Sequence, residues 1–416
     1  MRHRAHGKSQ SWKPILQGDL ACLACQSVRA ILADLPAEAS LASESSLAGG
    51  TAGLAILHGY LAEAGYGPNH VDAAHRFLQG ALAAVTHKPT AASLYSGLTG
   101  IGWALAHLGR RLPNLDGEDA LAEIDGALLN YLGQSRWVGP YDLIDGLVGF
   151  GVYALERLPW PAAVATLERV VGRLAQTAER RDDGVTWRTD PTWLAPETRA
   201  EIPLGGYNLG LAHGVPGVVA LLGQACAAGV AAQTARPLAE SAVHWLLAQQ
   251  GFQGFGFWAN PEAVSRPGRL AWCYGDPGVA AALLCTGRCL NAPTFQRQAL
   301  AIARRAAKGS PEQAGVVDAG LCHGASGLGH LFNRAYQASG DEVLAEAARS
   351  WFGEALRMRR PGRGVGGYEA WVNGRGWTSE LGLLTGAAGV ALALLAATTL
   401  IEPEWDRVLL VSGIQP

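Results

Sequence analysis

The chain has 416 residues, of which 49% are hydrophobic and only 16% are charged, so a disordered chain is excluded. Its 33 basic and 35 acidic residues give a formal net charge of −2, which argues against a nucleic-acid-binding protein, because phosphate contacts usually need a basic excess. Its seven cysteines, without a secretory signal, indicate a reducing compartment rather than a disulfide scaffold.

The N-terminal segment from Met1 to Lys13 is basic and has no apolar stretch. We therefore expect a loose arm there rather than a targeting segment.

One short pattern, Gly-x-x-Gly followed by an apolar segment, recurs seven times along the chain. Successive copies are separated by 47, 49, 68, 61, 49 and 62 residues. The copies begin at Gly50, Gly97, Gly146, Gly214, Gly275, Gly324 and Gly386. Such regular internal similarity is typical of a repeat architecture.

Each repeat contains two kinds of predicted helix. The segments before the glycines are amphipathic, with charges at helical spacing, and include Glu118–Leu132, Pro237–Gln249, Phe295–Lys308 and Asp341–Leu356. The segments after the glycines are nearly free of charge and include Leu98–Leu108, Val215–Leu222, Val279–Thr286 and Val390–Leu400. We therefore expect each unit to contain one outer helix that is exposed to solvent on one face, a glycine loop, and one inner helix that is buried on all sides.

Seven such units predict a single all-α domain over residues 1–416, with an inner barrel of seven helices inside an outer barrel of seven. An open solenoid is the alternative, but it normally needs polar caps at its ends. The last repeat is the most apolar, which favours a closed ring.

The segment from Leu381 to Ile401 contains 21 residues without a charge, which is long enough to span a bilayer. It lies between Glu380 and Glu402, has no basic flank and is interrupted by glycines. We therefore predict a helix buried on all sides and no transmembrane segment.

The glycines are expected where a helix N-terminus approaches a neighbouring backbone or needs a positive φ. The seven glycine loops would then meet at one end of the barrel, in a bowl into which free N–H groups and helix dipoles point. The longest gap contains Arg180 to Tyr207, predicted to be an inserted loop or small appendage near the mouth of the bowl. A contact with substrate and a surface loop without a role remain equal alternatives.

Two neighbouring glycine loops carry Cys273 and the pair Cys322 and His323, which are candidate metal ligands. Two thiolates and one imidazole suit Zn²⁺ and leave a fourth position open, as in catalytic sites. The two cysteines are 49 residues apart, but equivalent positions of neighbouring repeats are adjacent on a ring. From spacing alone, buried residues without a metal are an equal alternative.

The charge of such a site favours thiol chemistry. A zinc ion with two thiolates and an imidazole is nearly neutral and activates water poorly, whereas a substrate thiol bound there stays deprotonated and nucleophilic. Arg269, four residues before Cys273, is a candidate to hold a carboxylate or a developing oxyanion. His213 and Asp142 supply a titratable acid or base and a candidate orienting carboxylate.

The remaining cysteines and several histidines are interpreted as core residues. The cysteines are Cys22, Cys25, Cys226, Cys285 and Cys289. The histidines, which lie on predicted inner helices and are expected to be hydrogen-bonded, are His58, His107 and His330.

Four motifs, in this order along the chain, resemble those of the lanthionine synthetase C-like family. They are Tyr-Asp-Leu-Ile-Asp-Gly at 141–146, Gly-Leu-Ala-His-Gly-Val-Pro-Gly at 210–217, Arg-x-x-x-Cys-Tyr-Gly at 269–275 and Cys-His-Gly at 322–324. The resemblance covers the whole chain and implies a seven-fold α/α toroid, with short loop insertions, that binds one zinc ion in the bowl.

The resemblance also implies roles for single residues. Cys273, Cys322 and His323 would bind zinc, and His213 and Asp142 would transfer protons. Arg269 and Tyr274 would line the site. Asp145 is close to Asp142 in sequence, but the family pattern points to the residue directly after the tyrosine.

The activity implied is that of a stand-alone lanthipeptide cyclase in lantibiotic biosynthesis. Such an enzyme adds cysteine thiols to dehydroalanine or dehydrobutyrine in a dehydrated precursor peptide with a leader, forming thioether rings. We expect a cytoplasmic protein whose partners are a dehydratase and an exporter, with a peripheral membrane association only through that complex. No dehydratase domain is expected before the toroid.

Two other functions stay open from the sequence. One is a protein that binds glutathione or adds it to a substrate, and another is a non-catalytic scaffold of a biosynthetic complex. A six-fold toroid of the terpene cyclase type is disfavoured by the seven repeats and by the absence of an Asp-rich diphosphate motif.

Overall fold

A computed structural model of the chain describes residues 12–35, 44–87, 90–115, 117–259, 268–309 and 314–413, without the side chains of residues 86–87. Residues 1–11 of the expected N-terminal arm lie outside this part. Trp12 is buried, and its indole N–H donates to the carbonyl oxygen of Ala396 at 2.8 Å, so the chain is already packed on the fold at this point.

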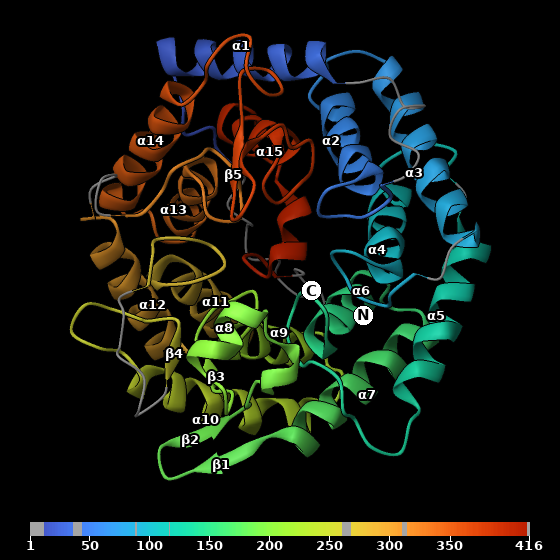
Figure 1. The fold of residues 1–416 in the computed structure, drawn as a ribbon, viewed down its shortest axis with the longest axis vertical. Coiled ribbons are helices and arrows are strands. Elements are labelled where there is room, and N and C mark those ends of the chain that lie inside the picture. Colours follow the sequence, from blue (N-terminus) through green and yellow to red (C-terminus); the bar gives the residue numbers. More distant parts are fainter. Residues whose placement is uncertain are drawn as a thin grey trace, which may run out of the picture.

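Within the described residues, seven inner and seven outer helices form two concentric rings (Figure 1). The inner helices are α2 (Thr51–Glu63), α4 (Leu98–Gly109), α6 (Leu147–Glu156), α9 (Val215–Ala227), α11 (Asp276–Cys289), α13 (Ala325–Ser339) and α15 (Ala387–Thr398). The outer helices are α1 (Gly18–Asp34), α3 (Asn69–His87), α5 (Glu118–Leu132), α7 (Pro161–Thr177), α10 (Ala232–Ala248), α12 (Pro293–Ala306) and α14 (Glu342–Arg357). The predicted all-α toroid is confirmed.

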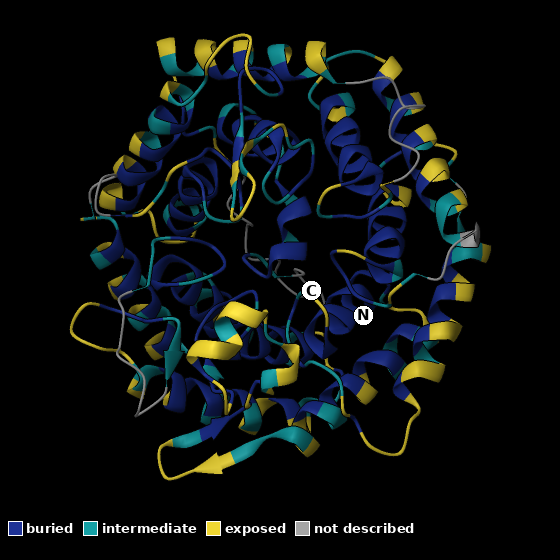
Figure 2. Ribbon diagram, in the orientation of Figure 1, coloured by how far each residue is buried: buried dark blue, intermediate teal, exposed yellow. Residues whose placement is uncertain are grey.

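The hydrophobic pattern explains which helices lie inside. Every residue of α15 from Ala387 to Ala397 is buried, whereas α7 buries only one face, at positions three and four apart (Figure 2). No helix in the described part of the chain is long and apolar enough to cross a membrane. The apolar segment of the last repeat is therefore the buried inner helix that the sequence predicts.

The pairing of helices differs from the expected unit. Along most of the ring each inner helix packs mainly on the outer helix that follows it in sequence, as α2 does on α3 and α13 on α14. The last inner helix, α15, packs instead on the first outer helix, α1, and on the inner helices α13 and α2. The two ends of the chain thereby close the ring.

The repeated glycines are required by close approach of the backbone. A Cβ on the second glycine of each motif would lie too close to the carbonyl oxygen six residues before it, for example 2.5 Å from Leu47 at Gly53 and 2.6 Å from Leu211 at Gly217. A Cβ on the first glycine of each motif would likewise lie too close to the preceding loop. Among these first glycines only Gly275 has a positive φ, +86°. The loop before each inner helix therefore folds back onto its first turn.

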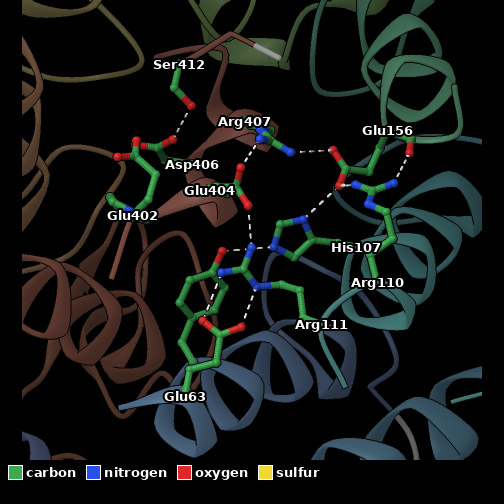
Figure 3. A network of polar contacts seen from close by, with 12 residues as sticks. Glu63, His107, Arg110, Arg111, Glu156, Glu402, Glu404, Asp406, Arg407 and Ser412 are labelled. Carbon is green, nitrogen blue, oxygen red and sulfur yellow. Dashed lines mark hydrogen bonds and ion pairs between the residues drawn. The ribbon is translucent and has the colours of Figure 1, made fainter. Parts of the chain in front are cut away.

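The C-terminal residues fill the centre of the inner ring (Figure 1). Within them, the 3₁₀ helix η3 (Glu404–Leu409) is anchored to the surrounding helices by charged groups (Figure 3). Glu404 pairs with Arg111 and Arg407, and Arg407 also approaches Glu156 at 4.0 Å. Buried Asp406 pairs with Arg334 and with His330, at 2.6 Å from the latter.

The three predicted core histidines are all buried and hydrogen-bonded. His58 lies 2.9 Å from His70 between ring nitrogens, and His107 lies 2.8 Å from Glu156. His330 is held by Asp406, as described above. These predictions are confirmed.

Short strands and helices lie in the connections between the ring helices, most of them between α7 and α11 and one hairpin between α14 and α15. The strand β1 (Glu179–Arg181) pairs with β2 (Gly184–Thr186), and they are followed by η2 (Pro191–Trp193) and α8 (Pro196–Glu201). Further on, β3 (Tyr207–Asn208) pairs with β4 (Trp258–Ala259), and β5 (Ala370–Val372) pairs with β6 (Gly376–Thr378). The predicted appendage at 180–207 is thus an ordered element, drawn in front of the ring around α8 (Figure 1).

Candidate metal centre

The loops that precede the inner helices are joined by backbone hydrogen bonds from one repeat to the next. Each link runs from an N–H in one loop to a carbonyl oxygen in a neighbouring loop. The links are Leu143 to Ala212 (3.1 Å), Ala212 to Cys273 (3.4 Å), Cys273 to Cys322 (3.3 Å), Cys322 to Leu384 (2.8 Å), Leu384 to Ala48 (3.2 Å) and Ala48 to Tyr95 (2.9 Å). Residues of neighbouring repeats, which are 47 or more positions apart in sequence, are therefore direct neighbours at this end of the barrel.

The ligand atoms of Cys273, Cys322 and His323 all lie within 4.8 Å of one another. Among the described residues this is the one group of three or more His, Cys, Asp or Glu side chains close enough to share a metal ion. Cys273 is buried, and the other two are partly buried. The structure thus brings together the two cysteines at equivalent positions of neighbouring repeats and the histidine that directly follows the second cysteine.

The surroundings of His323 fit a metal ligand. Its Nδ1 atom is buried and has no hydrogen-bond partner among the described residues, whereas its Nε2 atom lies 3.8 Å from Oδ2 of Asp318. Asp318 is itself held by the backbone N–H groups of Gly320 and Trp371, each at 3.0 Å. A carboxylate near the outer nitrogen of a ligating histidine is common around zinc, and Nδ1 of His323 remains available to an ion.

One of the two thiols is shifted toward the charged form that a metal ligand needs, whereas the hydrogen bond to Cys273 and burial raise the pKa of the other, Cys322. A hydrogen bond from Cys322 holds the pKa of the Cys273 thiol well below its usual value, against the effect of burial, and His323 and Arg269 act in the same direction. The Arg269 Nη2 atom lies 3.5 Å from the sulfur of Cys273. Its Nε–H is buried and has no hydrogen-bond partner among the described residues.

A histidine–carboxylate pair lies next to this cluster. Nδ1 of His213 is 2.8 Å from Oδ2 of Asp142, whose other oxygen accepts the backbone N–H of Asp145 at 2.9 Å. Burial lowers the pKa of His213, but the hydrogen bond and charge of Asp142, together with Cys273, outweigh it and raise the pKa. The side chain of His213 is 41% exposed, so it can meet a ligand in the bowl.

Tyr274 connects the pair to the appendage. Its ring stacks on His213 with centroids 6.2 Å apart, and its hydroxyl accepts a hydrogen bond from Nδ2 of Asn208 at 3.0 Å. Burial raises the pKa of Tyr274, so its hydroxyl stays protonated at neutral pH. Tyr274 is therefore placed to shape the wall of the site rather than to act as a base.

Sequence reasoning missed Asp318 and Asn208. Both lie six residues before the first glycine of their repeats, the same position as Arg269. A register alignment of the repeats would have found this polar position, since the three residues reach the bowl from equivalent places.

The remaining cysteines are less uniform than expected. Cys285 is buried, as predicted, but Cys25, Cys226 and Cys289 are only partly buried. The prediction is wrong for Cys22, which is exposed because it lies on the outward face of α1, the first outer helix.

Comparison with known proteins agrees with this description. Residues 42–410 match the family model described as "Lanthionine synthetase C-like protein". Among solved structures, one titled "Nisin cyclase" matches with a TM-score of 0.73 and 19% sequence identity, over 89% of this chain and 92% of that one. No curated protein sequence matches the chain.

Proposed function

The chain belongs to the lanthionine synthetase C-like family, and we propose that it is a zinc-dependent cyclase that closes thioether rings in a dehydrated precursor peptide. The proposal rests on one observation: the ligand atoms of Cys273, Cys322 and His323 lie close together, beside the His213–Asp142 pair. This arrangement combines a thiol-binding metal site with a titratable group at one end of the barrel.

The three proposed ligands would leave a fourth coordination position open for substrate. Zn²⁺ held by two thiolates and an imidazole would lower the pKa of a peptide thiol bound beside them. Asp318, by its place next to Nε2 of His323, would fix the orientation of that ring.

The proposed reaction is an intramolecular addition. A bond forms between the cysteine sulfur and the β-carbon of dehydroalanine or dehydrobutyrine, and the carbon–carbon π bond breaks. The proton lost from the thiol is balanced by one gained at the α-carbon, so the mass of the peptide does not change. Lanthionine or methyllanthionine is the product.

The chain's own groups have distinct roles in this proposal. His213, whose Nδ1 is bonded to Asp142, has its Nε2 free to accept the thiol proton and to return a proton to the α-carbon. The unpartnered Nε–H of Arg269 would hold the negative charge that develops on the carbonyl oxygen of the dehydro residue. Holding both reactants in the bowl would supply the control of ring position.

The partners follow from the same proposal. The substrate would be a precursor peptide with a leader, dehydrated by a separate enzyme. A dehydratase and an exporter are thus the proposed members of a common complex.

The test is a mass assay on a synthetic peptide that contains dehydroalanine and cysteine. We expect the protein with zinc to remove one alkylatable thiol per ring at unchanged peptide mass. A peptide that keeps its thiol would contradict the proposal. A mass increase by one glutathione, in a parallel reaction with glutathione, would favour the glutathione-adding alternative.

A further inference from the structure

A cavity of about 230 Å³ lies between the appendage and the loop that precedes α6. One wall is formed by Trp193, Leu194, Ala195 and Thr198, and the other by residues 140–142 and Asp145. His213 and Tyr274 also line it, but none of the three candidate zinc ligands does. The cavity therefore adjoins the His213–Asp142 pair on a side separate from the metal site.

The size of the cavity suits one side chain. Pockets for whole small molecules usually occupy about 300–1,000 Å³, which is more than this cavity offers. If the reacting atoms of a peptide lie beside His213, the side chain of a neighbouring peptide residue can reach this cavity.

The charge of the cavity is negative. Its lining contains Asp142 and Asp145 but no lysine or arginine. Asp142 is already engaged by His213, whereas the carboxylate of Asp145 has no ion pair among the described residues. Burial and the nearby charge of Asp142 raise the pKa of Asp145, and the charge of His213 opposes this shift only in part. Asp145 thus presents a charge that a ligand can neutralise.

The rest of the lining is largely aromatic. Trp193 on η2 is 38% exposed, and Trp258 on β4 is partly exposed, so both keep ring surface available to a ligand. A carboxylate beside aromatic rings is the environment that binds an ammonium or guanidinium group, by ion pairing and by cation–π contact.

We propose that this cavity is a substrate subsite that binds a lysine or arginine side chain adjacent to the reacting cysteine of the peptide. The proposal rests on the proposed function for the identity of the ligand as a peptide. Asp145 is the residue that sets the preference for positive charge, and Trp193 supplies an apolar contact for the aliphatic part of the side chain.

The first test measures binding rather than catalysis. Fluorescein-labelled linear peptides containing Ser and Cys, identical except for Lys, Gln, Leu or Glu at the positions flanking the cysteine, are titrated with the full-length protein. We expect the Lys peptide to bind roughly tenfold more tightly than the Glu peptide, as one partly exposed ion pair with an aromatic contact provides. The Gln peptide should lie between them.

Two variants assign the preference to Asp145. Asp145→Asn should remove the difference between the Lys and Glu peptides, and Asp145→Lys should reverse it. Asp182→Lys is the matched control, because Asp182 is an exposed carboxylate at the turn between β1 and β2 and does not line the cavity. This variant should keep the wild-type preference.

The outcomes separate the subsite from the proposed reaction. Equal binding of all peptides, tightest binding of the Leu peptide, or no binding at all would overturn the subsite, even if rings are closed in the mass assay. A preference for Lys that depends on Asp145, in a protein that closes no ring, would support the subsite and contradict the cyclase proposal.

Discussion

The indole N–H of Trp272 donates to the carbonyl oxygen of Leu409 at 2.9 Å. Trp272 directly precedes the candidate ligand Cys273, and Leu409 lies in the C-terminal segment that fills the centre of the inner ring (Figure 1). The hydroxyl of Tyr95 donates to the adjacent carbonyl oxygen of Val408, also at 2.9 Å. The C-terminal segment thus supports the metal-site loops from inside the barrel.

This contact predicts an effect on metal affinity. Trp272→Phe keeps an aromatic ring but removes the hydrogen bond to Leu409, so we expect zinc affinity to fall by roughly tenfold, as for other residues behind metal ligands. The measurement is competition with a chromophoric chelator. Trp103→Phe is the control, since Trp103 is equally buried but its Nε1 has no hydrogen-bond partner among the described residues. Equal affinities of the two variants would contradict this role of Trp272.

The metal centre itself predicts a stoichiometry. Elemental analysis of the wild-type protein should find one zinc ion per chain, and Cys322→Ala should lose it because only two of the three ligands remain. Cys226→Ala, which changes a partly buried cysteine outside the cluster, should keep its zinc. A wild-type protein without zinc would show that the ligand assignment is wrong.

The proposed proton transfer by His213 predicts a variant that keeps its zinc but loses its activity. His213→Ala should retain zinc but lose ring closure by a factor of about 100 or more, the usual size of general acid–base catalysis. Asp142→Asn should cause a smaller loss, because the imidazole stays in place without its orienting charge. His244→Ala, on the exposed face of α10, should cyclise at the wild-type rate. Wild-type kinetics for His213→Ala would remove this residue from the mechanism.

The close contacts around the repeated glycines predict that the effect of a Gly→Ala substitution on stability depends strongly on its position. Gly100→Ala places a Cβ against the carbonyl oxygen of Leu94 and 3.0 Å from Cβ of Leu47, so we expect the free energy of unfolding to fall by roughly 3 kcal/mol. Gly126→Ala, in the outer helix α5 with open space around the new Cβ, should instead gain up to about 1 kcal/mol. Urea denaturation of both variants and of the wild type measures these changes in the free energy of unfolding. Similar stabilities would show that the close approach is not required.

The buried anchor of the C-terminal segment predicts a pH dependence. Although burial alone would raise the pKa of Asp406, Arg334 and His330 hold it at about 2, below the ordinary value of 3.8. The stabilisation is therefore fully present above about pH 4 and is lost as the pH falls toward 2. This shift corresponds to roughly 2 kcal/mol.

The variant Asp406→Asn tests this directly. At pH 7 its free energy of unfolding should be lower by about 3 kcal/mol, because the buried guanidinium of Arg334 loses its charged partner and His330 loses the carboxylate to which it is hydrogen-bonded. The stability difference between wild type and variant should shrink as the pH is lowered from 4 to 2 in urea titrations. A difference that does not depend on pH would show that the charge of Asp406 is not the stabilising feature.

Much of the fold could be predicted because its information is local. The burial of α15 and the half-burial of α7 follow from the spacing of apolar residues, and the glycines mark the start of every inner helix. The grouping of Cys273 with Cys322 could also be predicted, since equivalent positions of neighbouring repeats must lie side by side on a ring.

Other features of the site could not be predicted in this way. Asp318 beside His323 and Asn208 beside Tyr274 depend on side chains that meet across loops. A register alignment of the repeats marks both positions as polar, but it does not tell which side chain each residue meets across the loops.

The sequence by itself determined the seven repeats, the inner and outer helices and the candidate ligand set, because period and composition decide which face of a helix is buried. Only the tertiary structure decided that α15 pairs with α1, that Leu409 supports Trp272, and that the appendage forms a cavity beside His213. These contacts join residues far apart in the chain, and their geometry is defined only once the ring has closed.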